Sequence, residues 1–331
     1  MLQTRKIDSI DYLKGFAAIF VVLHHAIVYM GLEGTSLIWQ VLLNVIMLTH
    51  VPLFFVLAGF LCYKQNFGKY IQKKALRILL PFFIFSSLKL IYSLFISDEF
   101  AHGTTLEAQL ISAYVRGGLY WFPYAITLCY CFAVCFWTPK QETASRFKKL
   151  LVPVVLVCLI LVNCRYYLPD YKILTYLQLG QAIRFFVFFL IGMMIRQHKE
   201  KLSHLFRKYQ ELILFASLLI MGLCSWMLIR LHGHYNYPAD LALGLSTMVV
   251  LFCISRILPN NWKPLKLAGK YSLQIMFFDS FNKVILLKLL PRFIPFSLPL
   301  IVVAVVLNLL ITIIACQIIE RIPRVRILFG L

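Results

Sequence analysis

A carboxylate, a lysine and two adjacent histidines stand in the stretch DYLKGFAAIFVVLHHAIVYM at residues 11–30, which otherwise resembles a membrane-spanning helix in composition. On an α-helix with about 100° per residue, Lys14 and His25 nearly eclipse each other three turns apart. Asp11 falls on the same stripe, whereas His24 points about 100° away. Histidine is the usual general base near neutral pH, and a hydroxyl that attacks an acyl group needs such a base.

Two interpretations of this stripe stay open. Asp11 and Lys14 can pair at i,i+3 while the lysine reaches the interface and His25 only packs. Alternatively, the stripe lines an internal path, since charged groups in lipid are costly and usually mark a working site. Lys14 would then bind an anionic ligand at the cytoplasmic mouth, and His25 would act about 16 Å deeper, at 1.5 Å per residue.

Further polar residues within apolar runs could line the same path. His50 stands in THVPLFFVLAGF, and Arg184 opens the run RFFVFFLIGMMI. Asp279 and Lys283 are spaced i,i+4 in MFFDSFNKVI, which suits an ion pair on one helix face. Each also has a purely structural interpretation. His50 can be a buried packing residue, Arg184 can reach the interface, and the pair on one helix face can be self-contained.

A basic cluster lies where another apolar run begins. Lys73, Lys74 and Arg77 gather on helical spacing in KQNFGKYIQKKALRILLP. They can mark a cytoplasmic loop, or they can form a clamp for the phosphates of a cytoplasmic cofactor.

The elements that must position these residues are membrane-spanning helices. The 331 residues are 61% hydrophobic, against about 45–50% for soluble domains. A span needs about 20 mostly apolar residues, and we expect an all-α polytopic bundle of about ten spans. They are 10–30, 37–62, 78–97, 119–137, 150–168, 179–195, 211–230, 240–257, 271–289 and 298–319.

The charge pattern sets the expected orientation. Most of the 33 lysines and arginines fall in every second loop, which predicts that both termini are cytoplasmic. The net charge of +20 is therefore explained without a nucleic-acid partner. The loops are short, so we expect one integral-membrane domain over residues 1–331 with no appended soluble domain. The nine cysteines show no metal-ligand spacing, and we expect no metal.

Several stretches, in order along the chain, resemble motifs of the acyltransferase 3 family of membrane enzymes. SIDYLKGFAAIFVVLHH is similar to the family's first span, where ten residues separate an arginine from a histidine; here ten separate Lys14 from His25. HVPLFFVLAGF at residues 50–60 resembles a second motif. KALRILLP, which includes Lys74 and Arg77, resembles the family's Arg-x-x-Arg element.

Two later stretches extend the resemblance. LYWFPYAITLCY around Trp121 resembles the family's Trp-Phe stretch, and LAGKYSLQIMFFD, which ends at Asp279, resembles its late LGKYSL segment. The chain departs from the pattern where Lys14 and Lys74 replace arginines, which removes the bidentate fork, and where Ala58 replaces a serine. Asp279 replaces the family's second histidine, so the resemblance gives no second base at this position.

The resemblance implies transfer of an acyl group, usually acetyl from acetyl-CoA, in a bacterial cytoplasmic membrane. The acceptor would be a hydroxyl of a surface polysaccharide or a lipid-linked glycan, and acyl-CoA would enter from the cytoplasm. The predicted site has three groups of residues. They are the catalytic group His25, Asp11 and His50, the cofactor-binding group Lys14, Lys73, Lys74 and Arg77, and the substrate-binding group Trp121, Arg184 and Asp279.

Two other function classes stay open. A multi-pass transporter or flippase could use the intramembrane charges to bind its substrate, and would transport without consuming CoA. A non-catalytic membrane partner or sensor would keep its histidines for packing alone. The length of the acyl group, acetyl or longer, and the identity of the acceptor also stay open.

Overall fold

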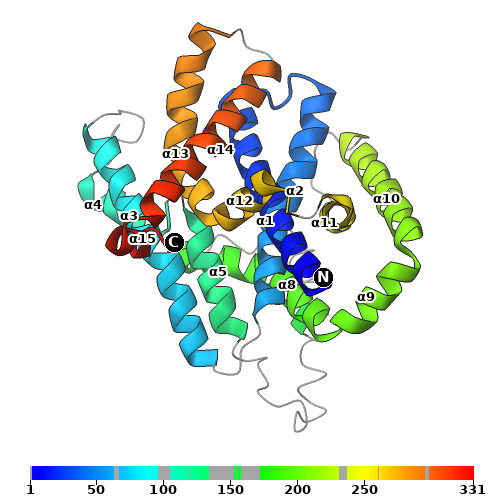
Figure 1. Cartoon of the computed structure of the whole chain (residues 1–331). Coiled ribbons are helices and arrows are strands. Elements are labelled where there is room, and N and C mark those ends of the chain that lie inside the picture. The colour runs from blue at the N-terminus through cyan, green and yellow to red at the C-terminus, as the bar shows by residue number, and fades with distance from the viewer. Residues whose placement is uncertain are drawn as a thin grey trace. The chain divides into compact units, whose positions relative to one another are not determined.

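The computed structural model describes residues 2–62, 67–95, 105–118, 120–133, 153, 155–157, 172–230, 237–259, 261–294 and 298–331. Every regular element in these ranges is a helix, which confirms the all-α prediction. The long helices are α1 (Leu2–Tyr29), α2 (Leu37–Leu61), α3 (Phe67–Phe95), α8 (Leu179–Gln197), α10 (Gln210–Arg230), α11 (Tyr237–Ile257), α13 (Ser272–Leu289) and α14 (Leu298–Glu320) (Figure 1). The short ones are α4 (Leu106–Leu110), the π-helix η2 (Ile111–Val115), α5 (Trp121–Phe132), α7 (Lys172–Thr175), the 3-10 helix η4 (Tyr176–Gln178), α9 (Lys199–Lys208), α12 (Lys263–Lys270), the 3-10 helix η5 (Leu290–Arg292) and α15 (Pro323–Leu328).

Within the described residues, 7 helices are long and apolar enough to cross a membrane, so the chain is a multi-pass membrane protein. These spans are Ser9–Tyr29, Leu37–Leu61, Gly68–Tyr92, Ile173–Gln197, Gln210–Arg230, Pro238–Ile257 and Leu298–Glu320. Each corresponds to a predicted span, and α2 continues as a helix through Pro52.

The other three predicted spans differ in outcome. The range 119–137 contains the shorter apolar helix α5. Of the range 150–168, only residues 153 and 155–157 are described. The range 271–289 is helix α13, but three charged residues, Asp279, Lys283 and Lys288, keep it outside the apolar set.

The chain divides into two compact units, each built from separate segments. The first comprises Met1–Leu57 and Ile195–Ile318, and the second comprises Ala58–Met194 and Ile319–Leu331. The boundaries fall inside helices α2, α8 and α14. The single membrane domain over residues 1–331 stays a prediction.

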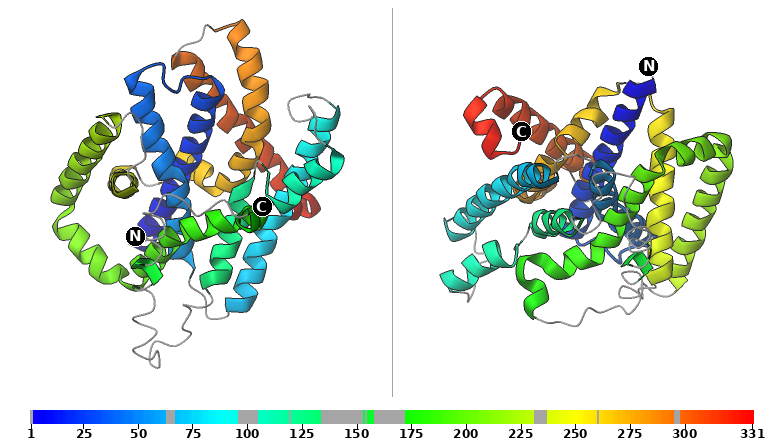
Figure 2. Two further views of the ribbon diagram at one scale, coloured as in Figure 1. Left: turned by 180° about the vertical axis from the view of Figure 1, so that it is seen from behind. Right: turned by 90° about the horizontal axis from the view of Figure 1, so that it is seen from below.

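In the first unit, α1 is the central element, and it packs against α11, α12 and α13 (Figure 2). Helix α10 packs on α11 and turns a broad apolar face outward, with only 11% of its span buried. Phe215, Leu219 and Trp226 lie on this exposed face. Such a surface suits contact with lipid tails rather than water.

In the second unit, α3 packs against α5, η2 and the C-terminal helix α15. Phe85 of α3 meets Phe329, just after α15, with their ring centroids 5.4 Å apart. Phe82 and Phe189 are fully buried in this unit. Aromatic side chains therefore form much of its core.

Candidate active site

Two glycines let α12 lie directly against the first half of α1 (Figure 1). A methyl group added at Gly15 would collide with the backbone carbonyl of Leu265, and one added at Gly269 would collide with that of Asp11. The first-span motif and the late LAGKYSL motif, far apart in sequence, thus supply the two sides of one close helix contact.

Two hydrogen bonds of Tyr12 connect α1 to the segment before α12. Its side chain is only 1% exposed, and its hydroxyl donates to the carbonyl of Pro259 at 2.7 Å. The same oxygen accepts from the backbone N–H of Trp262, also at 2.7 Å. Together with the glycine contact, these bonds fix where α12 and the following α13 start relative to α1.

Lys14 and Asp11 form the i,i+3 pair that the sequence left open. Lys14 Nζ lies 3.6 Å from Asp11 Oδ1, and both side chains are partly exposed. Asp11 precedes His25 by about 21 Å along α1 at 1.5 Å per residue. Asp11 therefore does not contact His25, and its catalytic role stays a prediction.

The partner of His25 is Asp279 on α13. His25 Nδ1 lies 2.5 Å from Asp279 Oδ2. The imidazole side chain is 35% exposed, whereas the carboxylate side chain is 1% exposed. The pair thus joins an accessible ring to a shielded anion.

A chain of buried amides supports Asp279 from behind. Asn308 Nδ2 on α14 donates to Asp279 Oδ1 at 2.7 Å. Asn282 Nδ2 donates to Asn308 Oδ1 and to Thr312 Oγ1, each at 3.0 Å. All four residues are buried, so each of these bonds is made away from water.

The directions of these bonds assign the proton on His25. An ionised carboxylate only accepts hydrogen bonds, and Asp279 accepts at Oδ1 from Asn308. At Oδ2 it accepts from His25, whose Nδ1 therefore carries the hydrogen. In the neutral ring the lone pair then sits on Nε2, which is the arrangement of a general base held by a carboxylate.

Two predictions concern the surroundings of Asp279. Both carboxylate oxygens accept hydrogen bonds and the residue is 0% exposed, and its substrate-binding role stays a prediction. It does not form the suggested i,i+4 ion pair with Lys283 among the described residues. Asp279 instead contacts His25.

His24 and His50 extend a row of imidazoles away from His25. The ring centroids of His24 and His25 are 5.3 Å apart, and those of His24 and His50 are also 5.3 Å apart. His50 is buried, and its Nδ1–H donates to the carbonyl of Ile46 at 2.6 Å. His50 therefore neighbours His24, and its catalytic role stays a prediction.

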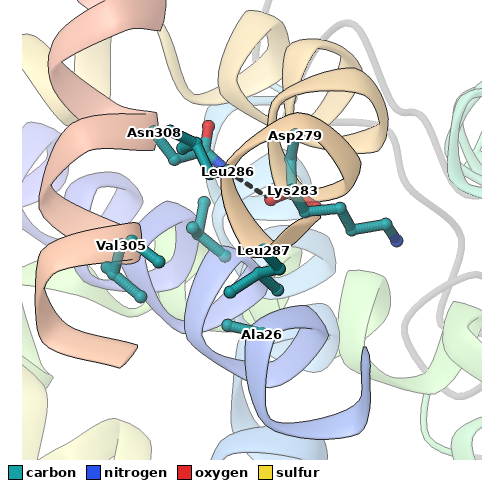
Figure 3. A pocket seen from close by; sticks show the side chains of 9 residues that line it. Ala26, Asp279, Lys283, Leu286, Leu287, Val305 and Asn308 are labelled. Carbon is teal, nitrogen blue, oxygen red and sulfur yellow. Dashed lines mark hydrogen bonds between the residues drawn. The ribbon is translucent and has the colours of Figure 1, made fainter. Parts of the chain in front are cut away.

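A small pocket of about 10 Å³ opens beside the pair (Figure 3). Asp279, Lys283 and Asn308 supply its polar lining, and apolar side chains of α1, α13 and α14 supply the rest. This volume holds about one water molecule, so the pocket is a recess next to the base rather than a complete substrate site.

The predicted phosphate-binding residues of α3 lie in the second unit. Lys73 is exposed, and Lys74 Nζ lies 5.6 Å from the centre of the Tyr70 ring. Arg77 Nε donates to the backbone carbonyl of Gly330 at 3.0 Å, so the C-terminal segment contacts this cluster. Their role toward a cofactor, like that of Lys14 in the first unit, stays a prediction.

The structure brings two predicted substrate-binding residues of the second unit to one phenyl ring. Trp121 of α5 stacks on Phe185 with ring centroids 5.5 Å apart. The guanidinium of Arg184 lies 5.7 Å from the centre of the same ring. Trp121 and Arg184 are thus brought together, because both contact Phe185.

 

Sequence reasoning missed Asn282, Asn308 and Thr312. A signal for them exists, since Asn308 and Thr312 stand at i,i+4 in an otherwise apolar span and Asn282 follows Asp279 by three residues. Polar residues on one face of a span usually face the bundle interior. That spacing shows a polar face, but not which neighbouring helix it meets.

The part of the chain that the structure describes contains no group of three or more His, Cys, Asp or Glu side chains that could hold a metal ion. A comparison with protein families matches residues 7–317 to a family described as an acyltransferase domain. Comparisons with curated proteins and with solved structures gave no match.

Proposed function

The chain belongs to the acyltransferase 3 family, and from this premise we propose that it moves an acyl group, most simply acetyl, from acyl-CoA to a hydroxyl of a surface polysaccharide or lipid-linked glycan. Membership in the family and the apolar helices make it a membrane acyltransferase. The acyl donor, the acceptor and the catalytic base are the parts that we propose.

The contact between His25 and Asp279 is the observation that carries the proposal. In the proposed step, His25 Nε2 takes the proton of the acceptor hydroxyl as its oxygen forms a bond to the thioester carbon. The C–S bond then breaks, its electron pair leaves on the sulfur of CoA, and the sulfur takes the proton from His25. The products are an ester and free CoA, and the enzyme ends as it began.

Asp279 supports this step by holding the ring and by stabilising its protonated form. A carboxylate at Nδ1 keeps the reactive nitrogen at a fixed place and balances the charge that the ring gains. Asn308 holds the other oxygen of Asp279 at 2.7 Å, which limits rotation of the carboxylate. Asp279 and Asn308 are thus positioning residues, and His25 is the catalytic residue.

The basic residues suit the polyanionic end of acyl-CoA. Lys14 in the first unit and Lys73, Lys74 and Arg77 in the second are the groups that we propose for its phosphates. We place both termini in the cytoplasm of a bacterium, where acyl-CoA is made, and the chain in the cytoplasmic membrane.

The direct test uses the purified full chain in lipid nanodiscs with labelled acetyl-CoA and extracted envelope glycan. We expect label in the glycan and an equal amount of free CoA. His25→Ala should lower kcat by about 10²- to 10⁴-fold, the usual contribution of a general base. His204→Ala, at an exposed position on α9, is the matched control and should keep activity.

Two results would overturn the proposal. Full transfer by His25→Ala would remove the base assignment. Movement of glycan across the membrane without any release of CoA would favour a transporter and remove acyl transfer itself.

A further inference from the structure

Lys283 lies one helical turn beyond Asp279 on α13 and lines the same pocket. Figure 3 shows its side chain extending away from Asn308, on the other side of the Asp279 carboxylate. It is half-buried, and it is near enough to His24 for their charges to interact. A cation therefore stands one helical turn from the carboxylate that contacts the proposed base.

Lys283 forms no ion pair with the carboxylate of Asp279, one turn earlier on the same helix. His25 and Asn308 occupy the two oxygens of Asp279, and Lys283 forms no ion pair within the described ranges. A lysine in this position among membrane helices is costly, and such residues usually contact a substrate or ion.

We propose that Lys283 binds the carbonyl oxygen of the acyl-CoA thioester and stabilises the oxyanion of the tetrahedral intermediate. This inference rests on the acyl transfer proposed above. As the acceptor oxygen bonds to the carbonyl carbon, its proton passes to His25 and the C=O π electrons move to the carbonyl oxygen. The ammonium of Lys283 donates to that oxygen until the C=O bond re-forms and the C–S bond breaks.

The chemistry needs such a donor, and the site offers a suitable one. Donors aimed at a developing oxyanion act strongly where water is excluded, and removing one typically costs about 10²- to 10³-fold in kcat. An ammonium group has three N–H donors and no acceptor. Lys283 can therefore donate to the oxyanion, and it cannot accept the proton that passes to His25.

The experiment compares Lys283→Met with Lys288→Met in the full chain in nanodiscs. Lys288 is on the same helix at an exposed position, so its loss removes the same charge away from the pocket. With acetyl-CoA as the donor, we expect Lys283→Met to lower kcat by about 10²- to 10³-fold with little change in KM. Lys288→Met should keep kcat, and Lys283→Arg should recover part of the loss.

A purely structural lysine would behave differently. If Lys283 only balances the charge of Asp279, Lys283→Met lowers the Tm, and adding Asp279→Asn restores it. That pattern, or a kcat for Lys283→Met equal to that of Lys288→Met, overturns the inference. Should the Met variant fail to fold, Lys283→Gln gives the same comparison, and full activity in it is equally decisive.

Parallel assays of His25→Ala separate the two proposals. If His25→Ala is inactive while Lys283→Met and Lys283→Gln are fully active, the oxyanion role fails and the proposed function stands. If His25→Ala is fully active, the base assignment fails first.

Discussion

The identity of residue 279 determines how His25 is held. The family resemblance places a histidine there, and this chain has an aspartate that is fully buried and bonded to His25. A histidine can act as a second base, whereas this carboxylate can only accept from its neighbours. The substitution therefore changes the position from a candidate base to a positioning group.

Asp279→Asn should lower kcat by about 10²- to 10⁴-fold, because the amide removes the charge that stabilises protonated His25 and can donate to Nδ1, which favours the wrong tautomer. The KM for acyl-CoA should change little. Transfer assays in nanodiscs measure both constants. Glu211→Gln, the same change at an exposed site on α10, is the control, and wild-type kcat in Asp279→Asn would contradict the prediction.

The sequence indicated His25 as a candidate base but could not indicate its partner. The periodicity of one helix places Asp11, Lys14 and His25 on one stripe, and the structure confirms that Lys14 pairs with Asp11. Periodicity says nothing about contacts between helices, and Asp279 follows His25 by 254 positions. The amides on α13 and α14 were missed for the same reason.

Among the elements, the contact of α12 with α1 controls where the site is assembled. The predicted spans found most of the long helices, because hydropathy over about 20 residues is a strong signal. Helix α12 has only 8 residues, too few for that signal, and its sequence motif did not reveal that it packs on α1. Its role follows from Gly15 and Gly269, where the two backbones approach closely.

Gly269→Ala should destabilise the protein by about 1–3 kcal/mol, since the added methyl group forces α12 away from α1. Thermal unfolding in detergent, read as Tm, measures the effect. Gly222→Ala is the matched control, because a methyl group there meets nothing within 4 Å and alanine favours a helix. Equal Tm values for the two variants would contradict the close contact.

For the molecule as a whole, the charge distribution predicts the side of the membrane on which each end lies. Lysine and arginine in alternate loops predict that both termini are cytoplasmic. Fusion of a fluorescent protein that matures only in the cytoplasm to the C-terminus should give a bright signal, and fusion of alkaline phosphatase there should be inactive. A phosphatase fusion at residue 233, between α10 and α11, should be active, because the charge pattern predicts that this position lies outside the cytoplasm. Phosphatase activity at the C-terminus would contradict this topology and with it the cytoplasmic entry of acyl-CoA at Lys14.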